Sequence, residues 1–192
     1  MSGDAIKLVT DALRSRLEIA LTRSTIPGTV FVGPLDDADS SGAALILFLY
    51  RIVPNASLRN RDHVIPTSTP PPIVFHNSLP LDLYYLVTVG TVPGSSEETL
   101  LTALGYAMQE LQVDPELTGP TINHQAVHVS IEPLTTEESS RIWALFPTAN
   151  YRTSVAYLAT PVWIDPDQPT LPAAPVVQDQ LQAGPINTEV AS

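Results

Sequence analysis

The strongest hydrophobic pattern of the chain is the run PLDLYYLVTVGTV at residues 80–92. In an extended chain, alternate side chains point to opposite faces. One face carries Leu81, Leu83, Tyr85, Val87 and Val89, and the other carries Asp82, Tyr84, Leu86 and Thr88. Because large apolar residues fall on both faces, this run is predicted to be a strand in the interior of a sheet that is covered on both sides.

The spacing of apolar residues predicts the other elements in the same way. The predicted helices are residues 4–20, 95–113 and 134–146. The further predicted strands are residues 29–32, 43–53, 127–132 and 153–164. Capping boxes, in which a hydroxyl and a carboxylate satisfy the first amides of a helix, are predicted for Ser95 with Glu98 and for Thr135 with Glu138. The strand at 43–53 is apolar up to Arg51, which predicts a second central strand near the first.

Three features inside these elements carry further expectations. The buried stripe of the second helix is predicted to be Leu101, Leu104, Met108 and Leu111, with Ala107 beside it. Gly105 in the same helix costs about 1 kcal/mol relative to alanine, so we expect a neighbouring backbone to approach it closely. Pro161 lacks the amide hydrogen that a sheet requires, which predicts an edge position or a bulge for the last strand.

Two stretches have no such pattern. Residues 55–77 are polar and then proline-rich, which predicts a connection over the surface. From residue 165 onward proline is frequent and every charged residue is acidic, which predicts an extended tail. We therefore predict one domain over residues 1–164 and a tail over 165–192 that docks along a neighbouring subunit or partner; the alternative is that it folds back on its own domain.

Composition limits the classes of partner. The formal net charge is -11, with 9 Lys and Arg against 20 Asp and Glu. Nucleic acids and anionic membranes attract basic surfaces, so neither is expected as a partner. The chain has no cysteine, no basic and apolar leader, and no apolar run of membrane length. These features predict a protein that is made in the cytoplasm and is soluble there.

Residues 36–42 match part of a metal-binding pattern. Asp37, Asp39, Ser41 and Gly42 match the first half of a calcium-binding loop. The position that would supply the bidentate glutamate is Phe48, and the flanking residues indicate strands instead of helices. A solvated acidic turn is therefore the better interpretation.

The histidines give no clear catalytic or metal arrangement either. His124 and His128 have the same parity and would share a strand face, as a metal pair does, but no third ligand is indicated. His63 and His76 are isolated in the surface connection, and spacing alone assembles no Ser-His-Asp arrangement. The charges of Arg59, Arg61 and Asp62 are interpreted as exposed, and Trp143 and Trp163 as core or interface anchors. No catalytic residue, cofactor or metal is predicted.

Several blocks of the sequence resemble a known family. They are LFLYRIVPNASLRNRD at residues 47–62, LPLDLYYLVTV at 79–89 with LGYAMQELQ at 104–112, and VSIEPLTTEESSRIWALF at 129–146, which continues into YRTSVAYLATPVWI. In kind and order these blocks resemble the amino-terminal domain of the tail-terminator, or cap, proteins of phage-tail-like contractile injection systems. The resemblance extends from the first helix to about residue 164.

The resemblance implies a fold and a role that the residue patterns by themselves do not. It implies a phage tail-terminator-like fold, in which a mixed, mainly antiparallel sheet carries packed helices. It implies a homohexameric ring on the distal end of the inner tube and sheath, which ends polymerisation and sets particle length. The implied partners are further copies of the chain, the tube protein and the sheath protein, in a particle whose release from the cell is left open.

Two other classes of function stay open at this point. A tube or baseplate adaptor of the same particle would have the same acidic surface and the same lack of catalytic motifs. A hydrolase that combines a serine or aspartate with a histidine would require His124 or His128 to lie in a pocket.

Overall fold

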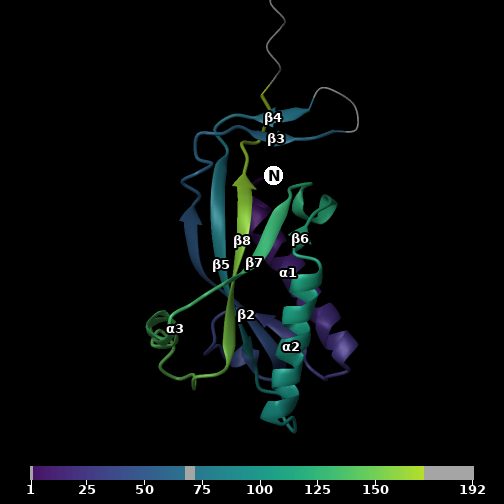
Figure 1. Ribbon diagram of the computed structural model, residues 1–192, viewed down its shortest axis with the longest axis vertical. Coiled ribbons are helices and arrows are strands. Elements are labelled where there is room, and N and C mark those ends of the chain that lie inside the picture. The colour runs from purple at the N-terminus through teal and green to yellow at the C-terminus, as the bar shows by residue number, and fades with distance from the viewer. Residues whose placement is uncertain (1, 68–71, 171–192) are drawn as a thin grey trace, which may run out of the picture.

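The computed structural model describes residues 2–67 and 72–170, which form one six-stranded sheet, a two-stranded sheet and the helices that pack on them (Figure 1). In chain order the elements are η1 (Ser2–Asp4), α1 (Ala5–Ser24), β1 (Thr29–Val32), η2 (Ala38–Ser40), β2 (Ala43–Pro54), β3 (His63–Ile65), β4 (Ile73–Phe75), β5 (Leu79–Val89), α2 (Glu97–Val113), β6 (Glu116–Leu117), η3 (Pro120–Ile122), β7 (Val127–Glu132), α3 (Thr136–Trp143) and β8 (Ser154–Ile164). Most of the predicted tail, from residue 171 onward, lies outside the described residues.

The large sheet has the strand order β1-β2-β5-β8-β7-β6. Strand β1 runs parallel to β2, and the other neighbouring pairs are antiparallel. The predicted mixed, mainly antiparallel fold is therefore confirmed. Strand β5 pairs with β2 on one side and with β8 on the other, so the prediction of a central strand at this place is also confirmed.

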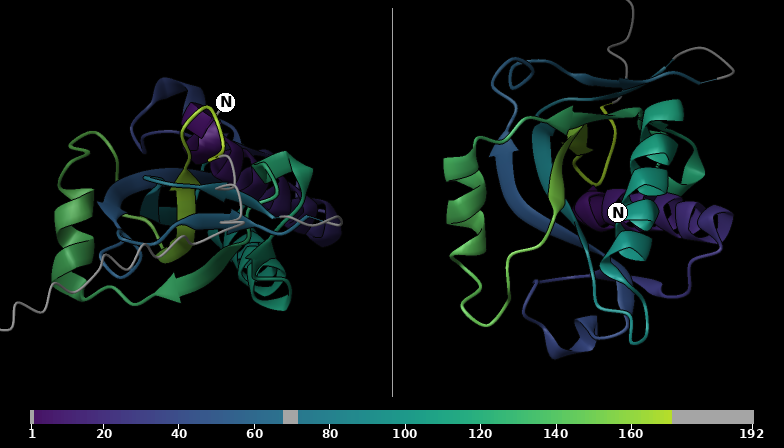
Figure 2. Two further views of the ribbon diagram at one scale, coloured as in Figure 1. Left: turned by 90° about the horizontal axis from the view of Figure 1, so that it is seen from above. Right: turned by 60° about the horizontal axis from the view of Figure 1, so that its bottom comes forward.

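The two faces of β5 are buried in two different clusters, as the alternation predicts. Leu83, Tyr85 and Val87 are at most 1% exposed and lie in the larger cluster, which α1 and α2 cover. Leu86 on the opposite face belongs to a smaller cluster with Trp143 and Phe146, from α3 and the turn that follows it. Helices α1 and α2 thus lie on one side of the sheet and α3 on the other (Figure 2).

The start of α2 differs from the prediction by one residue. Ser96, not Ser95, caps the helix, and its hydroxyl accepts a hydrogen bond from the amide of Thr99 at 3.2 Å. The buried stripe is therefore Leu100, Ala103, Leu104, Ala107 and Leu111, while Leu101 is 42% exposed. Gly105 faces open space, with no atom within 4 Å of the position that a Cβ would take, so the predicted close approach of a backbone is wrong.

An ion network joins α1 to α2. The carboxylate of Glu110 on α2 forms ion pairs with Arg16, at 3.7 Å, and with Arg23, both on α1. Arg16 also pairs with Asp114, the C-cap residue of α2. The Glu110 side chain is only 10% exposed, so these two arginines supply the partners that a buried carboxylate needs. The network links α1 to α2 beside the apolar cluster that both helices cover.

Helix α3 has the predicted capping box and a shorter extent than predicted. The hydroxyl of Thr135 accepts from the amide of Glu138, and the Glu138 carboxylate accepts from the amide of Thr135 at 2.9 Å. These hydrogen bonds hold the pKa of the Glu138 carboxyl below its usual value. The helix ends at Trp143, before Phe146, because the chain turns there to bury both aromatic rings against the sheet.

Strand β8 shows which of the two predictions from Pro161 holds. The strand lies between β5 and β7, so the predicted edge position is wrong. The pairing with β5 shifts register between Leu81 and Leu83, opposite the segment that contains Pro161, so the predicted irregularity is confirmed. The bond between Thr160 and Pro161 is cis. The shift lets a proline without an amide hydrogen occupy an interior strand.

Two buried tyrosines under the helices give a testable prediction. The Tyr85 hydroxyl is 2.8 Å from the Thr10 hydroxyl, whereas the hydroxyl of Tyr157 has no hydrogen-bond partner among the described residues. Burial raises the pKa of Tyr157 to about 12. Because an unsatisfied buried hydroxyl is unfavourable, Tyr157→Phe is expected to raise the free energy of unfolding by about 1 kcal/mol, and Tyr85→Phe to lower it by a similar amount. Urea denaturation of both variants checks this; a loss of stability in Tyr157→Phe would contradict it.

Candidate functional site

The segment predicted as a surface connection contains a short hairpin, which the sequence interpretation missed. Strands β3 and β4 pair in an antiparallel manner, with His63 opposite Phe75 and Ile65 opposite Ile73. This hairpin arm, residues 63–65 and 73–75, lies beyond the upper ends of β5 and β8 (Figure 1). Val64 is 51% exposed and Ile73 39% exposed, so the arm presents apolar side chains to the surroundings.

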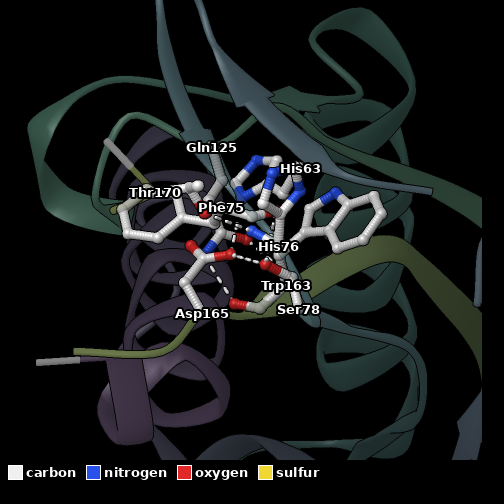
Figure 3. A network of polar contacts seen from close by, with 8 residues as sticks. All are labelled: His63, Phe75, His76, Ser78, Gln125, Trp163, Asp165 and Thr170. Carbon is white, nitrogen blue, oxygen red and sulfur yellow. Dashed lines mark hydrogen bonds and ion pairs between the residues drawn. The ribbon is translucent and has the colours of Figure 1, made fainter. Parts of the chain in front are cut away.

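A polar network anchors this arm to the end of β8 (Figure 3). The carboxylate of Asp165 lies 2.8 Å from Nδ1 of His63 and accepts a hydrogen bond from the Ser78 hydroxyl at 2.7 Å. The side chains of His63 and Asp165 are 9% and 10% exposed. A buried carboxylate is stable only when it is paired, so Asp165 holds β3 and the start of β5 together.

Aromatic and amide contacts complete the anchor. The His63 ring stacks on Trp163 at 4.8 Å between centroids, with an angle of 5° between the planes. The side chain of Gln125 donates to the carbonyl of Trp163 and accepts from its amide, both at 2.8 Å. The amide of Thr170 donates to the carbonyl of Val74 at 2.8 Å, which adds the chain after β8 to the edge of β4. The arm is thus held at both of its strands.

The anchoring network contains a serine, a histidine and an aspartate, yet it is not arranged as a nucleophilic triad. In such a triad the serine hydroxyl donates to the histidine, and the aspartate orients that histidine from its other side. Here the hydroxyl of Ser78 donates to the carboxylate of Asp165, and Ser78 is only 5% exposed. The network is therefore structural. His63, predicted to be isolated, is instead buried at its centre.

The other histidine candidate, a shared strand face for His124 and His128, is wrong. His124 lies in the turn after η3 with φ 59, before β7 begins at Val127. His128 lies on β7, half exposed, with Nδ1 2.6 Å from a carboxylate oxygen of Glu116 on β6. Two grooves that residues of α3 help to line, of about 230 and 580 Å³, have no histidine among their lining residues. The hydrolase alternative therefore has no supporting geometry at these residues.

The remaining candidates also behave as structural or exposed groups. Asp37 accepts from the amide of Asp39 at 2.9 Å and so caps η2. Across the described ranges, no three His, Cys, Asp or Glu side chains gather as metal ligands do. Arg59 and Arg61 are exposed, and Asp62 pairs with His76 at 2.7 Å. Both tryptophans are 7% exposed and pack in the core as predicted.

The sheet edges are the surfaces with unused hydrogen-bonding groups. Strand β1 forms one edge of the large sheet and the two-residue β6 forms the other. The sequence interpretation allowed an edge position for the strand with Pro161, which the structure places in the interior. Within the part of the chain that the structure describes, no helix is both long and apolar enough to cross a membrane.

A signal for the missed hairpin was present in the sequence. The short runs HVI at residues 63–65 and IVF at 73–75, rich in β-branched residues, flank the proline-rich segment TSTPPP, and two such runs around a proline-rich segment indicate a hairpin. The partners of Asp165 had no such signal, because His63 and Ser78 are distant from it in sequence.

Comparison with solved structures finds the same fold in two known assemblies. The first is the sheath/tube terminator of PVC, an extracellular contractile injection system, in its extended state, with a TM-score of 0.66 and 15% identity over 97% of this chain. The second is the tube-terminating cap of the anti-feeding prophage, with a TM-score of 0.64 and 17% identity over 91% of this chain. This chain covers 65% and 60% of those two chains.

Comparison with sequence families agrees with the fold. No curated protein matches this chain. The model of the Pvc16 N-terminal domain matches residues 8–178, which include every strand of the large sheet. The resemblance to tail-terminator proteins that the sequence blocks indicate is thereby confirmed. The chain belongs to the Pvc16 N-terminal domain family.

Proposed function

We propose that this protein is a structural cap of a contractile injection system. It occupies the distal end of the inner tube and the last sheath layer, ends their polymerisation and so sets the length of the particle. The observation that carries this proposal is the agreement of its fold, over 97% and 91% of the chain, with a sheath/tube terminator and a tube-terminating cap.

The proposed cap is a homo-oligomeric ring, with six copies to match a six-fold tube. Ring closure requires two different lateral surfaces on each copy. Strands β1 and β6, at opposite edges of the sheet, offer such a pair, and exposed strand edges associate through their backbone groups. The Pro161 strand, interior to the sheet, has no part in this contact.

The hairpin arm supplies a separate surface for the tube or sheath. Its exposed Val64 and Ile73 are apolar, and the buried pair of His63 with Asp165 holds it at a fixed angle to the sheet. A rigid apolar surface loses little conformational entropy on binding, which favours a contact with a regular polymer end.

A catalytic role is not part of this proposal, and neither is a cofactor. The formal net charge of -11 opposes binding to nucleic acid or to an anionic membrane. We place synthesis and assembly in the cytoplasm, within a particle that resembles an extracellular system. Residues 1–164 form the proposed cap domain and residues 165–192 the proposed tail.

The decisive experiment is removal of the chain from cells that assemble the particle. Electron microscopy is expected to show tubes and sheaths of uncontrolled length, and the intact gene supplied in trans is expected to restore a uniform length. Particles of normal length in the deletion strain would overturn the cap assignment. A gold-labelled copy found at the baseplate end would instead indicate an adaptor.

A single substitution tests whether the imidazole of His128 is required for assembly. His128→Ala removes an exposed imidazole whose partner, Glu116, is also half exposed, so particle length is expected to stay uniform. Loss of assembly in this variant would assign His128 a role that the geometry does not indicate.

A further inference from the structure

The upper half of β2 is a free strand edge. Strand β1 pairs with β2 only as far as Leu47, whereas β2 continues to Pro54. Residues 48–54 pair with β5 on one side, and no described segment bonds to their backbone on the other. Figure 1 shows this end of β2 as the outermost ribbon of the sheet. Unpaired strand edges accept an added strand from another chain.

The free edge carries a distinct side-chain pattern on the face of the sheet that α3 covers in part. Phe48 packs on Phe146, Arg51 lies opposite Tyr84, and Val53 lies opposite Asp82. The guanidinium of Arg51 is 5.0 Å from the centre of the Tyr84 ring, and within the described ranges it forms no ion pair with a carboxylate. The edge therefore presents a cation between two apolar residues.

A charge and a register shift between Leu49 and Arg51 protect this edge against unspecific pairing. A strand that pairs here must place an acid near Arg51 and apolar side chains on either side of that acid. This required order of one acidic and two apolar side chains limits which segments of the chain can pair with the edge.

The tail contains one such segment. Residues 176–184 and 186–192 are its proline-free runs beyond the described residues. In the first run, alternate positions are Val177, Asp179 and Leu181, which is an acid between two apolar residues. In the second run, the acid Glu189 has Asn187 and Ala191 at the alternate positions. Only the first run matches Phe48, Arg51 and Val53.

The position and composition of the start of the tail favour contact of residues 176–184 with another copy of the chain. The Thr170 amide is bonded to Val74 of the hairpin arm, so the tail departs from that point. Prolines at residues 166, 169, 172 and 175 recur every three residues, and this spacing favours an extended, stiff course. A fully extended linker from Thr170 to Val176 would reach about 20 Å, and the recurring prolines favour such an extended course over a reversal.

We propose that residues 176–182 of one copy add as a strand to β2 of a second copy, along residues 48–54, with Asp179 facing Arg51. Although both chains are acidic, this contact pairs the opposite charges of Asp179 and Arg51 beside the unpaired backbone groups of β2. This contact involves neither the tube nor the sheath, so its test is independent of the test of the proposed cap function.

The absence of native cysteine permits a direct test with the full-length chain. One preparation carries Val53→Cys, and a second, with a different tag, carries Val177→Cys or Leu181→Cys. After mixing and mild oxidation, the disulfide-linked heterodimer on a non-reducing gel is expected to exceed that of the control variants about tenfold, because docking raises the effective concentration of the thiols. The variant that reacts, Val177→Cys or Leu181→Cys, reports the direction of the added strand.

Two matched controls define the site. Val190→Cys lies in the other proline-free run, and Val32→Cys, 38% exposed, lies on the edge of β1. If either control yields as much heterodimer as the test pair, the proposal is wrong. If Val53→Cys and Val177→Cys join only within one chain that carries both changes, the tail folds back on its own domain and the contact between copies is also wrong.

Reversal of the charges tests the role of Asp179. Arg51→Glu in the Val53→Cys preparation is expected to reduce the heterodimer to the level of the controls, because two acids then face each other. Asp179→Arg in the partner preparation is expected to restore it. A yield that does not recover in this combination, with both variants folded by circular dichroism, would overturn the proposed pairing of Asp179 with Arg51.

Discussion

Replacement of Gly90 with alanine is expected to lower the free energy of unfolding by about 3 kcal/mol or more. Gly90 follows the last residue of β5 and donates its amide hydrogen to the carbonyl of Ala44 at 2.8 Å. A Cβ at this position would lie 2.1 Å from the carbonyl oxygen of Ala43 and 2.8 Å from its carbon. Both are backbone atoms of β2, so the added methyl group must displace the pairing of the two central strands.

Gly105→Ala is the matched control for this change. The Cβ at this position meets no atom within 4 Å, and the residue lies inside α2. Because glycine is unfavourable in a helix interior, this variant is expected to raise the free energy of unfolding by about 0.5 to 1 kcal/mol. Urea denaturation of the two variants and the parent gives the comparison. Equal stability of Gly90→Ala and the parent would show that β2 and β5 tolerate a wider separation than their geometry indicates.

Asp165→Ala is expected to lower the free energy of unfolding by about 3 kcal/mol, because it leaves buried partners without their acceptor. The carboxylate pairs with His63 and accepts from Ser78, and both of those residues are less than one-tenth exposed. Hydrogen exchange should show the larger part of the change in β3 and β4, whose amides lose their anchor to β8.

Asp62→Ala removes a comparable contact in an exposed setting. Asp62 and His76 form their pair with about half of each side chain exposed. Exposed ion pairs contribute little, so this variant is expected to lose less than about 1 kcal/mol and to keep the exchange rates of the arm. If Asp165→Ala is no less stable than Asp62→Ala, the buried network does not hold the arm. The arm would then be a poor candidate for a rigid assembly surface.

Local patterns in the sequence determined the elements that bury an unbroken apolar surface. The alternation at residues 81–89 predicted a central strand that is covered on both faces, and β5 has that position. The capping box of Thr135 with Glu138 was predicted, and it is present at the start of α3. These signals are reliable because burial of a side chain and satisfaction of a helix amide depend on residues a few positions apart.

Where two neighbouring residues offered the same chemistry, only the packed structure decided between them. Ser95 and Ser96 both precede α2, and the cap at Ser96 turns Leu100 into the core and Leu101 towards solvent. Both residues have the side-chain hydroxyl that a helix cap requires. The choice depends on which face of the helix meets α1 and the sheet, and that information is not local.

The order of strands and the partners of single polar residues were decided by the tertiary structure alone. Pro161 was compatible with an edge or a bulge, and the pairing of β7 with β8 settled it as an irregularity in an interior strand. The sequence separated His63 from Asp165 by 102 positions, yet they form the buried pair that anchors the hairpin arm. Periodicity reports whether a side chain is buried, whereas its partner depends on how distant segments meet, and long-range pairing leaves no trace in the spacing of neighbouring residues.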